Sequence, residues 1–191
     1  MKKITYILSV VFLLGLMTGC ANYAEDYDRN TLIVKKNGSL IEVAVEDFSK
    51  TSVKADALSV YITEQIDNFN EKQDKKVVKN KDLLTEDMSK VKLVLEYKDI
   101  DGYNGFNLLE CKLTDFADVD EKELKGTFTS ADGKSVKVGK MEDTKGAKVL
   151  MISEKTDVIL PGDILYYNKE VSMKKGVASA SGKGNAIIIY K

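Results

Sequence analysis

Residues 99–110 are the strongest candidate for a metal site, because they partly match the calcium loop of an EF-hand. Such a loop needs oxygen ligands at positions 1, 3, 5 and 12 and a glycine at position 6. Asp99, Asp101 and Glu110 supply positions 1, 3 and 12. Tyr103, however, occupies position 5, the glycines fall at positions 4 and 7, and no pair of amphipathic helices flanks the segment. The pattern favours a capped turn, and no metal ligand is predicted.

Two further motifs suggest phosphate binding or acyl transfer, and both are incomplete. The glycine-rich stretch from Gly176 to Gly184 resembles a P-loop, but its spacing is one residue too long and no Ser or Thr follows Lys183. Ser172 and Lys175 match the S-x-x-K of penicillin-interacting enzymes, whose S-D-N and K-T-G partners are missing. We interpret the first motif as a hairpin turn and assign no catalysis to the second.

Composition excludes several common kinds of active site. The chain has 191 residues and no histidine, which removes Ser-His-Asp triads, Cys-His pairs and HExxH zinc sites. Cys111 alternates with Leu109 and Leu113, so we interpret it as a small buried residue rather than a nucleophile. The carboxylates cannot be paired from the sequence, and we predict no catalytic residue, no cofactor and no metal. The net charge of −1 gives no reason to expect a nucleic-acid partner.

The most specific signal lies in the first twenty residues. Lys2 and Lys3 precede an apolar run at residues 4–17, which at about 14 residues is shorter than the roughly 20 of a membrane-spanning helix. This run is typical of a signal peptide. It ends in Leu-Met-Thr-Gly-Cys at residues 16–20, which resembles the lipobox of bacterial lipoproteins, where a small residue precedes an invariant cysteine.

The lipobox resemblance implies that a diacylglycerol is attached to Cys20 and that residues 1–19 are removed as a lipoprotein signal peptide. Two acyl chains hold a protein stably in a bilayer, whereas one chain binds only marginally. The alternative is an ordinary secretory signal peptide whose cysteine is incidental. Residues 20–30 are polar and acidic, and we expect them to form a short disordered tether. Residues 31–191 are then expected to form an extracytoplasmic domain on the outer face of the cell membrane.

The clearest hairpin lies at residues 32–45, around an Asn-Gly dipeptide at residues 37–38. Asn-Gly favours a two-residue type I′ turn, because both of its residues accept positive φ angles. That turn would place Val34 opposite Ile41 and give the hairpin one apolar face.

One long amphipathic helix is predicted at residues 55–73. Leu58, Ile62 and Ile66 recur at helical spacing, with Tyr61 beside them. Five lysines follow within residues 72–81. We interpret them as a solvated helix end, and contact with anionic lipid headgroups is the alternative.

The remainder of the chain is rich in short apolar runs. The predicted strands lie at residues 91–97, 108–113, 127–129, 135–138, 149–152, 158–160, 164–167, 177–180 and 186–190. The five apolar residues of the last run indicate a strand covered on both faces. One helix with many short strands predicts an α+β single domain, in which the helix packs on a mostly antiparallel sheet.

The order of these segments resembles a group of uncharacterised bacterial lipoproteins of the low-GC Gram-positive type. The likeness runs over most of the chain after the lipobox, through residues 30–34, 45–49, 103–107, 156–162 and 187–191. The resemblance implies a lipid-anchored location and supplies no activity, cofactor or partner.

The sequence therefore predicts a membrane-anchored lipoprotein whose only predicted site residue is Cys20, with the membrane as its partner through the lipid. We expect it to be a non-catalytic binding or envelope-associated module and not an enzyme. The alternative is a His-free envelope hydrolase that uses carboxylate or Ser/Lys residues. A perturbed acid pair in a cleft would favour the hydrolase, whereas an exposed apolar patch would favour the binding module.

Overall fold

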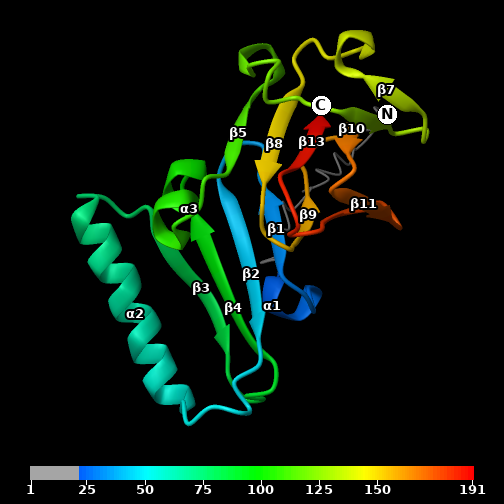
Figure 1. Ribbon diagram of the computed structural model, residues 1–191. Coiled ribbons are helices and arrows are strands. Elements are labelled where there is room, and N and C mark those ends of the chain that lie inside the picture. The colour runs from blue at the N-terminus through cyan, green and yellow to red at the C-terminus, as the bar shows by residue number, and fades with distance from the viewer. Residues whose placement is uncertain (1–21) are drawn as a thin grey trace, which may run out of the picture.

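The computed structural model describes residues 22–191, and these residues form two β-sheets with three α-helices and two short 3₁₀ helices (Figure 1). The helices are α1 (Tyr23–Asp26), α2 (Ala55–Lys72), α3 (Ile100–Asn107), η1 (Phe116–Asp118) and η2 (Val138–Lys140). The predicted signal peptide, the lipobox and Cys20 lie outside the described residues.

Sheet A contains seven strands. In chain order they are β1 (Thr31–Val34), β2 (Leu40–Glu46), β3 (Val78–Leu84), β4 (Val91–Tyr97), β9 (Asp157–Ile159), β11 (Val171–Lys174) and β12 (Val177–Ala180). In space they follow the order β11-β12-β9-β1-β2-β4-β3. Neighbouring strands are antiparallel except β1 and β9, which run parallel.

Sheet B contains six strands, and all neighbouring strands are antiparallel. In chain order they are β5 (Lys112–Asp115), β6 (Thr127–Ser130), β7 (Ser135–Lys137), β8 (Lys148–Ile152), β10 (Ile164–Asn168) and β13 (Ala186–Tyr190). In space they follow the order β5-β8-β13-β10-β6-β7. β13 is therefore an inner strand, and all five of its residues are buried, as its apolar run predicts.

The prediction of a mixed, mostly antiparallel fold is confirmed, but the prediction of a single helix on a single sheet is wrong. The short strands are divided between two sheets, which a pattern of apolar runs cannot reveal. β3 and β11 are not among the predicted strands, because both are polar strands at an edge of sheet A. Lysines and other polar side chains on an edge strand protect it from pairing with another chain.

The first hairpin forms at the predicted place with a different register. Lys35 pairs with Ser39 through a backbone hydrogen bond of 2.8 Å, which leaves a three-residue loop in place of the expected two. Gly38 alone has a positive φ in this loop, +84°, as in a type I turn followed by a bulge. Val34 consequently lies opposite Leu40 and not opposite Ile41. Because side chains alternate between the two faces of a strand, this one-residue shift changes which side chains of β2 share a face with Val34.

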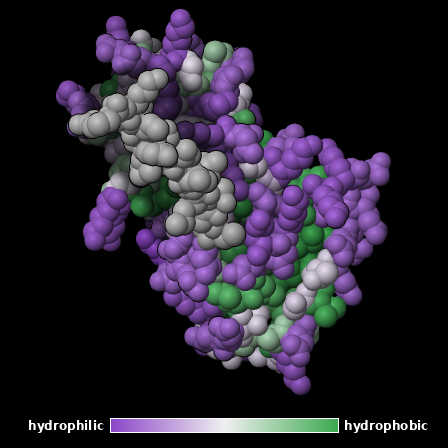
Figure 2. Space-filling view, turned by 180° about the vertical axis from the view of Figure 1, so that it is seen from behind, coloured by the Kyte–Doolittle hydropathy of each residue, from purple (hydrophilic) through white to green (hydrophobic). Residues whose placement is uncertain are grey.

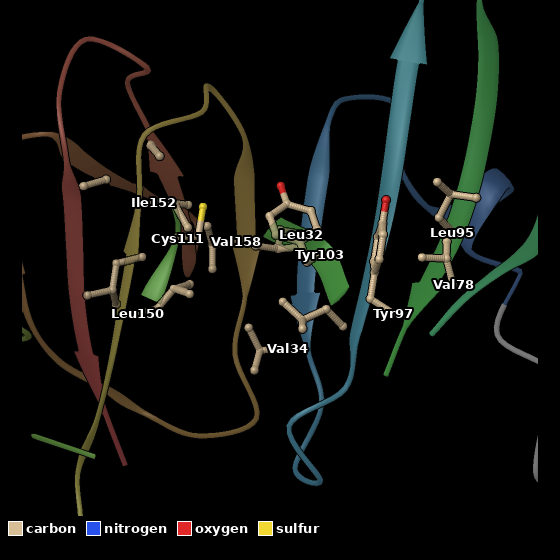
Figure 3. Close-up of a cluster of buried hydrophobic side chains, with 14 of the residues drawn as sticks. Leu32, Val34, Val78, Leu95, Tyr97, Tyr103, Cys111, Leu150, Ile152 and Val158 are labelled. Atoms are coloured by element: carbon tan, nitrogen blue, oxygen red, sulfur yellow. The ribbon is translucent and has the colours of Figure 1, made fainter. Parts of the chain in front are cut away.

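The main hydrophobic core lies on one face of sheet A. Side chains of α2, α3 and sheet B all pack there, and Figure 3 shows the part of this core between the two sheets. A second core covers the other face of sheet B, around Phe128, Val149 and Ile189. A third and smaller core lies on the opposite face of sheet A, where Ala24 of α1 packs against Val43 and other strand residues.

Residues 22–30, the described part of the expected disordered tether, pack against sheet A. Ala24 is fully buried, and its carbonyl oxygen accepts a hydrogen bond of 2.6 Å from the Lys92 ammonium. The same ammonium contacts the Asp28 carboxylate at 2.9 Å. Lys90 also pairs with Asp28 at 2.6 Å, and these two lysines hold the pKa of this carboxyl at about 2. Apolar burial and charge pairing thus order a segment whose composition is polar.

The helix α2 confirms the prediction closely, since it begins at Ala55 and ends at Lys72. Leu58, Ile62 and Ile66 are buried, but Tyr61 is 58% exposed instead of lying with them. The lysines that follow do not all belong to a helix end. Lys79 and Lys81 stand on the edge strand β3, where Lys81 contacts Glu96 at 3.6 Å.

Candidate functional site

The segment that partly matches a calcium loop forms α3, a two-turn helix in place of the expected turn. Asp99 is its N-cap, and its carboxylate accepts a hydrogen bond of 2.9 Å from the Gly102 amide. The carboxyl that fills loop position 1 therefore has a structural role. Within residues 22–191 no group of three or more His, Cys, Asp or Glu side chains is arranged to hold a metal ion.

The other two motifs also lie in strands and turns. Lys175 and Gly176 both have positive φ angles and form the turn between β11 and β12. Gly182 lies in the connection between β12 and β13, so no helix N-terminus follows this glycine-rich stretch. Ser172 is exposed on β11, while Lys175 belongs to the turn. Neither motif has the surroundings that its chemistry needs.

Cys111 is buried, in agreement with its alternation with leucines. Its thiol donates a hydrogen bond of 3.2 Å to the Glu154 carboxylate, and its backbone amide donates to the Asn104 side chain. Burial and the adjacent Glu154 raise the pKa of the thiol to about 12. A thiol with that pKa stays protonated at neutral pH and is a poor nucleophile.

A second carboxylate, Glu42, lies close to this thiol at the border of the main core. Its Oε2 atom accepts a hydrogen bond of 2.5 Å from the Tyr97 hydroxyl and one of 3.2 Å from the Asn107 amide. Asn107 also donates to the Tyr97 oxygen at 3.0 Å. Burial raises the pKa of Glu42 above its ordinary value, its two hydrogen-bond donors oppose this rise, and the charge of Glu154 adds to it.

Tyr103 completes this group of side chains. Its ring packs edge-on against Tyr97, with ring centroids 5.1 Å apart. The hydroxyls of both tyrosines and the thiol of Cys111 point in the same direction (Figure 3). Burial, Glu42 and Glu154 together raise the pKa of Tyr103. We call Glu42, Tyr97, Tyr103, Asn107, Cys111 and Glu154 the acidic–tyrosine cluster.

Sequence reasoning singled out Tyr103 and Cys111 separately and missed the cluster that joins them. Glu42 stands on β2 and Glu154 follows β8, so 112 positions separate them and no local motif could link them. The predicted register also placed Glu42 on the polar face of the hairpin. The available signal was the carboxylate of Glu42 within the apolar run at residues 40–45.

A groove lies between α2 and α3 and has a volume of about 600 Å³. Its wall includes apolar and aromatic side chains from both helices and from β4, with Gln65, Asn68, Lys72 and Gln73 among the polar ones. Tyr61 is 58% exposed and Leu108 is 90% exposed beside it. Seen from behind, hydrophobic residues are visible on the α2 side of the molecule, between hydrophilic ones (Figure 2). We call this feature the α2–α3 groove.

Leu108 has an unusual backbone as well as an exposed side chain. It caps the C-terminus of α3 with φ 56° and ψ 47°, the left-handed conformation. Glycine or asparagine usually occupies this position, because in other residues the Cβ atom comes too close to the following carbonyl oxygen, which costs roughly 1 kcal/mol. An exposed, left-handed leucine is unfavourable in two ways, and such outliers are more frequent at functional sites.

Comparison of the chain with protein-family models, with curated proteins and with solved structures gives no match. Within residues 22–191 no helix combines the length and the apolar character needed to cross a bilayer.

Proposed function

We propose that this chain is a lipid-anchored lipoprotein, exported by the signal peptide at residues 1–19 and held at the outer face of the cell membrane by Cys20. The support is the basic start of the chain, the short apolar run and the lipobox-like residues before Cys20. Replacement of Cys20 by Ala tests the anchor. Labelled palmitate should enter the wild type and not Cys20→Ala. Wild-type protein that carries no lipid and begins at another residue would contradict the proposal.

The domain at residues 31–191 is, in this proposal, a non-catalytic binding module whose binding surface is the α2–α3 groove. The observation that carries this function is Leu108, which stays exposed in a left-handed conformation beside an open apolar groove. A volume of about 600 Å³ lies within the range of ligand sites. Covering Leu108 and Tyr61 with apolar atoms would remove unfavourable exposed area from water.

The charge of the groove indicates the kind of partner. Among the residues of 22–191 that line it, Lys72 alone is charged, and the exposed Lys75 and Lys76 follow it in the chain. The occupant that fits is a segment of another envelope protein with apolar side chains next to an acidic residue. The apolar side chains would lie against Phe106 and Leu108, and the acidic residue would lie near Lys72.

Photo-crosslinking tests this proposal in intact membranes. A photoreactive amino acid in place of Tyr61 should form an adduct, and mass spectrometry should show that the linked peptide is apolar and next to an acidic residue. A second change, Leu108→Asp, should abolish the adduct. Met173→Asp is the matched control, because Met173 is also exposed, at 38%, but lies on β11. Equal adducts with both substitutions, or a basic linked peptide, would contradict the proposed surface.

One observation favours the alternative, a His-free envelope hydrolase. Burial and the negative charge of Glu154 raise the pKa of Glu42, as expected of the general acid in a pair of catalytic carboxylates. Incubation with cell-wall glycan and peptide fragments tests this function. Hydrolysis by the wild type that Glu42→Gln abolishes would establish a hydrolase, and the absence of hydrolysis would leave the binding module.

A further inference from the structure

The acidic–tyrosine cluster has hydrogen-bond acceptors that the protein leaves open. The Oε2 atom of Glu42 is occupied by Tyr97 and Asn107, but its Oε1 atom accepts no hydrogen bond from the side chains of residues 22–191. Among residues 22–191, Glu154 accepts only two weak or short-range hydrogen bonds, from the Cys111 thiol and from Ser153 next to it. A carboxylate offers about four lone-pair sites, so both carboxylates keep free capacity.

The Tyr103 hydroxyl is also without a partner. The residue is only 2% exposed, and its hydroxyl makes no hydrogen bond with other described residues, although its ring is fixed against Tyr97. Within residues 22–191 no fully buried side-chain oxygen or nitrogen lacks a partner. The Tyr103 oxygen must therefore touch space that solvent can reach. A buried tyrosine normally satisfies its hydroxyl, so this one is available to a ligand.

Charge is unbalanced at the same place. Neither Glu42 nor Glu154 forms an ion pair with a lysine or arginine among the described residues, whereas seven other carboxylates there do. Both glutamates are partly buried, so water screens their charges less than at an open surface. Partly buried carboxylates without a positive partner attract a cation.

We propose that the acidic–tyrosine cluster binds the primary ammonium group of a small organic amine. An ammonium has three N–H donors, and the free Oε1 of Glu42, a Glu154 oxygen and the Tyr103 hydroxyl supply three acceptors. A metal ion fits less well, since residues 22–191 offer no group of three metal-binding side chains here.

This site is separate from the binding surface proposed above. None of its six residues lines the α2–α3 groove, so a ligand in the cluster and a partner in the groove contact different side chains. Failure of one proposal would leave the other standing.

Calorimetric titration of the full-length protein in detergent with n-butylammonium chloride tests the inference. At pH 7 and constant ionic strength we expect saturable binding at one site. Tetramethylammonium, which has no N–H donor, and the uncharged 1-butanol should bind at least about tenfold more weakly. Absence of saturable binding, equal binding of 1-butanol, or tighter binding of calcium would overturn the proposal.

Two variants locate the binding within the cluster. Tyr103→Phe removes only the hydroxyl and keeps the ring against Tyr97, and it should weaken butylammonium binding about tenfold, as should Glu154→Gln. Tyr167→Phe is the matched control, because it removes a tyrosine hydroxyl from β10 in sheet B, away from both the cluster and the groove, and binding should not change. Unchanged affinity in Tyr103→Phe, which retains the packing of the fold, would place the amine elsewhere and overturn the assignment.

Discussion

Sheet B and the α2 side of sheet A bury their apolar residues to very different degrees. In β13 the side chains of Ile188 and Ile189 are fully buried on opposite faces of sheet B. In α2 one face is buried through Ile62 and its neighbours, while Val60 and Tyr61 are more than half exposed. A strand that is covered on both faces exposes no side chains to a partner, whereas a helix at the edge of the core keeps one face exposed. We call sheet B the closed half, because its enclosed apolar residues stabilise the fold. We call the α2 side of sheet A the open half, because its exposed face leaves room for binding.

Buried polar groups show the same contrast. In sheet B the Asn168 side chain donates to the Asn185 carbonyl and accepts from the Ile187 amide, so its bonding groups are used within the protein. At the border of the α2 side, the Tyr103 hydroxyl and one oxygen of Glu42 form no hydrogen bond with the part of the chain that the structure describes. Asn168 is thus structural, whereas the Tyr103 hydroxyl and the free oxygen of Glu42 stay accessible.

The largest expected effect comes from making the same kind of cavity in both halves. Ile188→Ala should lower the free energy of unfolding by about 4 kcal/mol, because neighbours on all sides enclose the cavity. Ile62→Ala should lower it by only about 2 kcal/mol, because the side of α2 next to the groove can relax. Chemical denaturation of both variants gives the two values. Equal losses would mean that the two halves are packed equally well.

A smaller effect of opposite sign is expected at Leu108. Leu108→Gly relieves the left-handed backbone and removes an exposed leucine, so the free energy of unfolding should rise by about 1 kcal/mol. Photo-crosslinking from position 61 should weaken in the same variant. Thermal unfolding and the crosslinking yield measure the two effects. A variant that is more stable and crosslinks as well as the wild type would show that Leu108 is not kept for binding.

The smallest effect is a pH dependence from the acidic–tyrosine cluster. Because the pKa of Glu42 is raised in the folded state, the folded protein binds this proton more strongly than the unfolded chain does. The resulting stabilisation is fully present below the ordinary pKa of 4.5 and is lost as pH rises through the folded value. Glu42→Gln imitates the protonated carboxyl and should not show this loss.

Melting temperatures measured at a series of pH values above about 4.5 check this prediction. The difference between the wild type and Glu42→Gln should grow in favour of the variant as pH rises. Glu46→Gln, an exposed change on the same strand, is the control and should leave the wild-type curve unchanged. Parallel curves for wild type and Glu42→Gln would mean that this carboxyl titrates normally.

The sequence predicts elements well where hydrophobic periodicity is strong, as in α2, β4 and β13. It fails for β3, where Val78 is followed by Lys, Asn, Lys and Asp, because an edge strand needs few apolar residues. The hairpin shows that one loop residue decides a register, since Gly38 alone takes the left-handed conformation. Both candidate sites depend on contacts between distant segments. Neither the proximity of Glu42 to Glu154 nor the exposure of Leu108 is marked by a pattern in the neighbouring sequence.

The packing of residues 22–30 on sheet A has a consequence for the orientation of the domain. With a lipid on Cys20, only Ala21 and Asn22 precede α1, a distance of at most roughly 10 Å when extended. In the proposed lipoprotein, a domain attached so closely would be unable to rotate freely above the bilayer. Because α1 packs on the opposite face of sheet A from α2 and α3, the proposed anchor would turn the face with the groove and the cluster away from the membrane.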